Sequence, residues 1–326
     1  MRTRPHVRRG AIPTSALALL VFTAAWAAPA RADEPLFGFV YTTDLLPKGG
    51  MEVEQWLTYR WQKAYDQGTR AYSNLWQGRT EFSYGVTDAF QLSAYLNYNW
   101  NTAYLSNVER QTLPAEQFAG YSFDPNRRFN AQQFAGGSLE GIWRVLSPYT
   151  DPIGLAVLVE PSFGPNLFEF ETRLILQKNF LDNRLVIAFN VTLDFEYRQI
   201  PGDPDAPPEL ENSKRHWDAE TDLNWSIAAS YRFAPGWSFG GEFINEREFS
   251  NAPTFVNAKY ATNSAYYVGP TLHYGGRNFF ATLTFLYQLP LGQDFANPPP
   301  GLVRGGRNYA DDFEKYRLRF KVGFYF

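Results

Sequence analysis

The 326-residue sequence contains no cysteine and only three histidines. Without cysteine the chain can form no disulfide, and a transition-metal site built from His and Cys has almost no ligands to draw on. The absence is consistent with a protein that must stay unfolded across an oxidising compartment. An excess of basic residues is also missing, because 30 Lys and Arg stand against 33 Asp and Glu. This balance argues against nucleic-acid binding.

Long hydrophobic runs are scarce, and a mean hydropathy of −0.37 excludes a bundle of membrane helices. The one apolar run, at residues 16–28, follows a basic stretch and precedes an A-x-A cleavage pattern, so residues 1–32 are predicted to be a cleaved secretory signal. An uncleaved anchor helix is the alternative, although the run is short for a span. The basic residues and the cleavage site are Arg2, Arg4, Arg8, Arg9, Ala30, Ala32 and Asp33. Cleavage would remove five arginines and no acid, leaving a net charge of −8.

Aromatic residues, by contrast, are abundant at 17% of the chain, with 9 Trp, 20 Tyr and 28 Phe. A modest soluble core rarely uses so many. A transmembrane β-barrel does, because it carries a lipid-facing belt and two aromatic girdles.

The last ten residues alternate between apolar and charged side chains, the period of two that a pleated strand imposes. In a barrel the apolar face meets lipid, the charged face lines the lumen, and the terminal aromatic lies at the membrane interface. This ending resembles the closing strand of bacterial outer-membrane proteins, which implies recognition by the barrel insertion machinery. The residues that match this signal are Tyr316, Leu318, Phe320, Val322, Phe324 and Phe326.

Similar alternation recurs along the chain, separated by turn-forming residues. The predicted strands are Met51–Trp61, Ser73–Tyr84, Phe90–Asn101, Phe134–Leu146, Leu155–Phe163, Leu167–Phe180, Leu185–Arg198, Trp217–Arg232, Trp237–Phe249, Ser264–Tyr274, Phe279–Leu289 and Lys315–Phe326. Short and long connections largely alternate, as they do in bacterial barrels with both termini in the periplasm. We therefore predict an all-β fold, a transmembrane antiparallel up-and-down barrel of about 12 strands over residues 51–326.

Two stretches leave alternatives open. Residues 33–50 are predicted to be a periplasmic lead-in, either a tether or a segment folded against the barrel mouth. In the ninth strand, Asn245 and Arg247 fall on the lipid-facing side. Either this strand continues above the membrane or a bulge resets its register.

Several stretches beyond the closing strand carry a wider resemblance: Leu36–Trp56, Tyr84–Asp88, Leu146–Gly154, Gln177–Leu185 and Gly269–Gly276. On these the chain resembles a family of uncharacterised proteobacterial outer-membrane β-barrel proteins. The resemblance implies a location in the outer membrane of a Gram-negative bacterium, with outer-membrane lipid as a partner. It transfers no functional residues.

The sequence offers few residues from which a catalytic site could be built. By strand direction, His216 and His273 lie about a membrane thickness apart and cannot share a site. No catalytic, cofactor-binding or metal-binding residues are predicted, and the protein is expected not to be an enzyme.

Inward-facing charges are the main functional signal. A basic wall is predicted at Lys315, Arg317, Arg319 and Lys321, and an acidic wall at Glu169, Glu171, Asp194, Glu196, Asp218, Glu220 and Asp222. In a cylinder of twelve strands these walls would face each other. If the lumen is open, they would set up a transverse field in a channel for small polar solutes. If the walls meet and pair, they would fill the lumen and leave a closed structural or adhesive barrel. The oligomeric state stays open.

Overall fold

The structure is a computed structural model that describes residues 35–63, 72–103, 128–200, 214, 216–250, 258–295, 302–304, 307–310 and 313–326. The predicted cleavage residues Ala30, Ala32 and Asp33 lie outside this part of the chain. Among the described residues, no helix is long and apolar enough to cross a membrane.

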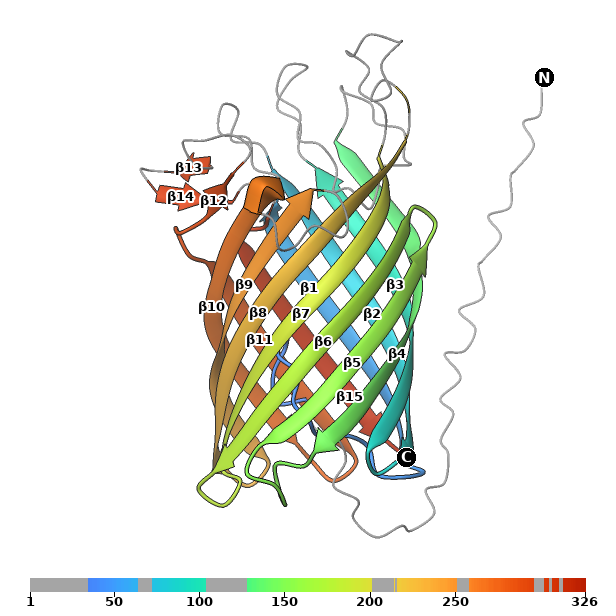
Figure 1. The fold of residues 1–326 in the computed structure, drawn as a ribbon, viewed down its shortest axis with the longest axis vertical. Coiled ribbons are helices and arrows are strands. Elements are labelled where there is room, and N and C mark those ends of the chain that lie inside the picture. The colour runs from blue at the N-terminus through green and yellow to red at the C-terminus, as the bar shows by residue number, and fades with distance from the viewer. Residues whose placement is uncertain are drawn as a thin grey trace, which may run out of the picture.

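Twelve long antiparallel strands form a closed barrel (Figure 1). They are β1 (Met51–Lys63), β2 (Ser73–Thr87), β3 (Phe90–Ala103), β4 (Phe129–Leu146), β5 (Gly154–Gly164), β6 (Leu167–Phe180), β7 (Leu185–Ile200), β8 (His216–Ala234), β9 (Trp237–Ser250), β10 (Ala261–Gly275), β11 (Phe279–Gln288) and β15 (Tyr316–Tyr325). Each strand pairs with the next in sequence, and β15 closes the barrel between β11 and β1. The predicted fold is therefore confirmed.

Short elements decorate one end of the barrel. A 3₁₀ helix at Ala258–Tyr260 precedes β10, and the two-residue β12 (Gln293–Asp294) adds to the β10 edge. The strands β13 (Leu302–Arg304) and β14 (Arg307–Tyr309) form a separate hairpin. We call this end the loop end. The opposite end is called the turn end, because the connections at 88–89, 147–153, 181–184, 235–236 and 276–278 are short.

The pleat sorts side chains between the outer surface and the lumen. On β8, Trp225 and Ile227 are 37% and 42% exposed on the outer surface, whereas the alternate residues Ser226 and Ala228 are buried. An apolar outer surface is what the hydrocarbon region of a membrane requires.

β4 begins five residues earlier than predicted, and a bulge explains the difference. Asn97 pairs with Gly136 but Tyr98 pairs with Phe134, so one residue is left over in β4. Gly136 takes a φ of 107°, which favours glycine. The extra residue reverses the faces, so the odd-numbered Phe129 and Ala131 are buried before it and the even-numbered Ser138 and Glu140 after it. The alternation that marks a strand is interrupted at this point.

The ninth strand shows no bulge at Asn245. β9 keeps one register against β10 from Trp237 to Arg247, and the irregularity comes later, between Ala261 and Ser264. Of the two alternatives, strand continuation is the one that the structure bears out. The Asn245 side chain is buried and donates to the Ser264 hydroxyl at 2.9 Å.

The closing strand places its apolar side chains outward. Phe320 and Phe324 are 39% and 50% exposed on the outer surface, while Tyr316 stacks on Trp61 of β1. Phe326 follows the strand and its amide donates to the Met51 carbonyl at 2.9 Å, so the last residue is tied to the first strand. Leu318 and Val322 lie on the same outer face.

Candidate functional site: a plugged lumen

The segment before β1 lies inside the barrel, in the half nearer the turn end (Figure 1). We call residues 35–48 the plug. Its side chains Phe37, Thr43 and Leu46 are at most 1% exposed, as in a protein core. Of the two alternatives for this segment, a tether or a segment folded against the barrel mouth, the described residues are folded against the barrel, but they lie inside its lumen rather than at its mouth. The physical reason is that the lumen wall supplies hydrogen-bond partners for this backbone, which no strand pairs.

One carboxylate on β9 anchors the tip of the plug. The side chain of Glu242, 1% exposed, accepts the backbone N–H groups of Gly38, Phe39 and Val40 at 2.8, 2.8 and 3.0 Å. It also accepts the hydroxyl of Thr284 at 2.8 Å. Hydrogen bonds to a charged acceptor are stronger than neutral ones. Glu242 therefore holds three consecutive residues of the plug.

Side-chain amides hold the rest of the plug. Asn190 accepts the Tyr41 N–H at 2.7 Å and donates to the Tyr41 carbonyl at 2.9 Å, as a neighbouring strand would. Gln177 accepts the Thr43 N–H at 2.6 Å. The anchoring amides are Gln91, Gln177 and Asn190. The plug backbone is thus satisfied by single side chains from separate strands rather than by a β-ladder.

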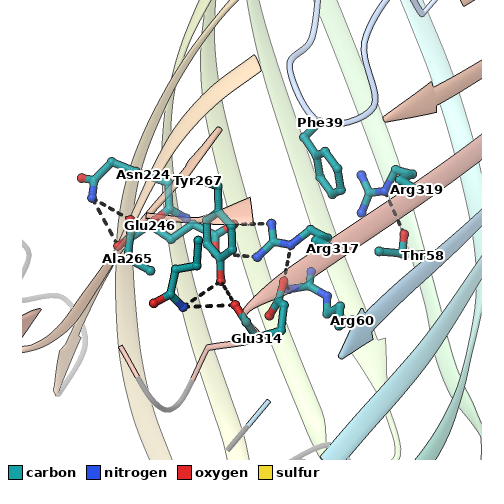
Figure 2. A network of polar contacts seen from close by, with 12 residues as sticks. Phe39, Thr58, Arg60, Asn224, Glu246, Ala265, Tyr267, Glu314, Arg317 and Arg319 are labelled. Atoms are coloured by element: carbon teal, nitrogen blue, oxygen red, sulfur yellow. Dashed lines mark hydrogen bonds and ion pairs between the residues drawn. The ribbon is translucent and has the colours of Figure 1, made fainter. Parts of the chain in front are cut away.

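Arg317 of the predicted basic wall is buried in a local ion-pair network (Figure 2). Its guanidinium donates to both carboxylate oxygens of Glu246 at 2.6 and 2.7 Å, contacts Glu314 and lies over the ring of Tyr267. Arg60 reaches Glu314 from β1 at 3.0 Å. Burial raises the pKa of the Glu314 carboxyl, but the two guanidinium groups outweigh it and hold that pKa at about 2.

Arg319 and Lys321 face the plug and β1. Arg319 donates to the carbonyl of Gly38 at 3.0 Å and lies 3.9 Å from the ring centroid of Phe39, next to which Figure 2 places it. Lys321 lies 3.6 Å from the ring centroid of Trp56. Lys315 lies outside this group, over the rings of Tyr309 and Tyr316 near the loop end. The residues of the predicted basic wall therefore contact the plug and neighbouring residues of the barrel.

The predicted acidic residues lie together on β6, β7 and β8, nearer the loop end. Glu171 is paired with Arg173 at 2.9 Å, and Arg198 contacts Glu196 and also Glu220. Asp218 stands apart as an exposed residue. Arg173 and Arg198 pair with these acids locally, and Arg319 of the predicted basic wall lines the same cavity as Glu169, Glu196 and Asp222. Sequence reasoning overlooked Arg173 and Arg198, although each alternates with acids on its own strand.

Two cavities flank the plug. The one at the turn end has a volume of about 590 Å³ and is lined by Asp44, Arg144 and Arg232, among others. The other, toward the loop end, has a volume of about 330 Å³ and is lined by acidic residues and by Arg319. The lining of the second is largely polar, whereas the first is lined by polar and apolar surface in similar amounts. Because plug residues line the first cavity and Arg319 holds the plug from the second, the plug separates them.

A closed barrel with an apolar outer surface and a polar lumen defines this protein as an outer-membrane β-barrel. More narrowly, the chain belongs to a family of unknown function (DUF6662), whose model matches residues 29–326. No curated protein sequence matches the chain.

Three solved structures are similar to the chain to different degrees. The COG4313 outer membrane channel from Pseudomonas putida F1 is 9% identical with a TM-score of 0.56, over 87% of this chain and 98% of that one. The translocator domain of the autotransporter NalP from Neisseria meningitidis is 9% identical with a TM-score of 0.49, over 86% of this chain and 90% of that one. The NanC porin is 12% identical with a TM-score of 0.43, over 84% and 98%. Of these three, the COG4313 channel has a TM-score above 0.5, and at 9% identity its likeness to the chain is one of fold alone.

Proposed function

We propose that the protein is a diffusion channel for small polar solutes, whose resting state is closed by the plug. Both termini would lie in the periplasm, so the plug would enter the lumen from the periplasmic side. The chain would reach the membrane through a cleaved signal and the insertion machinery.

The observation that carries the proposal is the way in which the lumen is filled. A cavity of about 590 Å³ lies at the turn end of the lumen, and one of about 330 Å³ lies toward the loop end. What separates the cavities is a segment outside the sheet, held by side chains such as Glu242 and Asn190. Such a segment can leave without breaking any inter-strand hydrogen bond.

A closed structural or adhesive barrel is the second candidate. The deep burial of Phe37 and Leu46 favours it, because removing these side chains from their surroundings exposes apolar surface. The two candidates differ in one measurable property, since only a channel conducts ions.

The experiment compares Glu242→Ala with Glu248→Ala in planar lipid bilayers. Both variants remove one lumenal carboxylate from β9, but only Glu242 holds the plug. Loss of three charge-assisted bonds of roughly 1.5–3 kcal/mol each should release the plug more often. We expect the open probability of E242A to exceed that of the wild type at least about tenfold, a change of ~1.4 kcal/mol.

E248A should gate like the wild type. Folded E242A protein without conductance steps would instead support the structural barrel.

A further inference from the structure

Carboxylates line up in two rows across adjacent strands near the loop end. In the first row Glu160 pairs with Glu171, Glu171 with Asp194, Asp194 with Asp222, and Asp222 with Glu248. In the second row, Glu169, Glu196 and Glu220 are opposite one another on β6, β7 and β8. Like charges directly opposite across a ladder destabilise a sheet. Arg79, Arg173 and Arg198 supply part of the positive charge that these rows need, by pairing with Glu160, Glu171, Glu196 and Glu220.

The oxygens at the centre of these rows are spaced for one cation. Glu169, Glu171 and Asp194 each offer a carboxylate oxygen within 4.8 Å of the other two. The same holds for Asp194, Glu196 and Asp222, so that Asp194 belongs to both groups. Oxygens at this spacing can all reach a single ion at about 2.4 Å, the usual distance of calcium ligands.

Asp194 supplies an independent observation. Its side chain is only 7% exposed, yet its Oδ1 atom has no hydrogen-bond partner. The Oδ1 atom of Asp222, opposite it on β8, is likewise buried without a partner. An unsatisfied buried carboxylate oxygen is costly, and a bound cation would satisfy it.

Access and chemistry point to the kind of ion. The loop-end cavity of about 330 Å³ is lined by Glu169, Glu196 and Asp222, so an ion can reach the group from water. The ligand set holds carboxylates only, which hard cations prefer to His- or Cys-binding metals. Ca²⁺ accepts six to eight oxygens in flexible geometry, whereas Mg²⁺ demands a near-ideal octahedron and keeps its waters.

We propose that this carboxylate cluster, centred on Asp194, binds a divalent cation of the calcium type and thereby joins β6, β7 and β8. The site is separate from the plug anchor Glu242. The proposal does not depend on whether the lumen conducts.

The test uses the full-length protein in detergent, treated with EDTA, dialysed and titrated with CaCl₂ by calorimetry. Wild type should bind Ca²⁺ with a Kd on the order of 10⁻⁴ M, as extracellular calcium modules do. Asp194→Asn should raise the Kd at least tenfold. Asp222→Asn should raise it less, because Asp222 belongs to one group only. The matched control Asp218→Asn removes an exposed charge of the same strand and should leave the Kd unchanged.

Thermal unfolding separates loss of binding from loss of folding. In EDTA, D194N should melt at or above the wild-type temperature, because one like charge has been removed. Ca²⁺ should raise the melting temperature of wild type and D218N but not that of D194N. No heat and no melting shift in wild type at millimolar CaCl₂ would overturn the proposal, as would wild-type affinity in D194N. Equal affinity for MgCl₂ would overturn the calcium-type assignment.

Discussion

At the scale of single residues, the lumen is organised by buried charges that are paired over long sequence distances. Arg317 on β15 binds Glu246 on β9, and three strand-to-strand steps separate them around the barrel. Removing one partner of such a pair leaves an uncompensated buried charge, which is strongly destabilising. Arg317 therefore links the closing strand β15 to β9, a strand with which β15 does not pair.

Glu314 gives this network a defined pH dependence. Its folded-state pKa of about 2 lies below the ordinary 4.5, so its contribution to stability is complete above pH 4.5 and is lost as the pH falls through 2. Glu314→Gln should lower the unfolding free energy by about 3 kcal/mol at neutral pH. The difference between wild type and E314Q should shrink from pH 4.5 toward pH 2 in chemical denaturation. A difference independent of pH would show that Glu314 is not held ionised by Arg317 and Arg60.

At this scale the sequence predicts which face of a strand a side chain occupies, but not which residue it contacts. In the structure Arg317 is buried against Glu246, and Arg319 donates to the plug carbonyl of Gly38. Their partners follow from strand register and barrel curvature, which no local pattern encodes. Glu242 was overlooked because nothing in the sequence distinguishes it from Glu246 and Glu248, the other inward acids of β9. The carboxylate rows likewise become visible only once register is known.

At the scale of elements, β15 completes the barrel through two ladders, with β1 and with β11. Phe326→Ser should leave export intact and reduce the folded fraction, because the terminal aromatic is proposed to anchor the strand and to signal insertion. The fraction is measured by heat-modifiable mobility on gels. Phe320→Ser, a lipid-facing change in the middle of the same strand, is the matched control. Equal folded fractions in wild type and F326S would remove the special role of the last residue.

Strand prediction succeeded where alternation is uninterrupted and failed where it is not. β8 was found almost to the residue because its outward and inward faces differ clearly along the strand. β4 was shortened because its bulge reverses the faces near Gly136. The depth of the plug in the lumen could not be predicted for another reason: its backbone partners are side chains of residues 91, 177, 190 and 242, far away in sequence.

At the scale of the whole molecule, the barrel and the plug are two parts with different kinds of bonding. The barrel is continuous through backbone ladders, whereas the plug is attached by side chains and by the Gly49–Gly85 backbone contact at the turn end. We propose that the two cavities on either side of the plug join when it leaves. The proposed channel therefore depends on one central claim, that the plug alone closes the lumen.

Deleting residues 35–48 tests this claim most directly, with conductance in planar bilayers as the measurement. Only preparations that show heat-modifiable mobility, and are therefore folded, would be compared. The account predicts a steady conductance in the deletion variant that is absent or rare in the full-length protein, and a block when a synthetic peptide of residues 35–48 is added back. A folded deletion variant that conducts no more than the full-length protein would contradict the account.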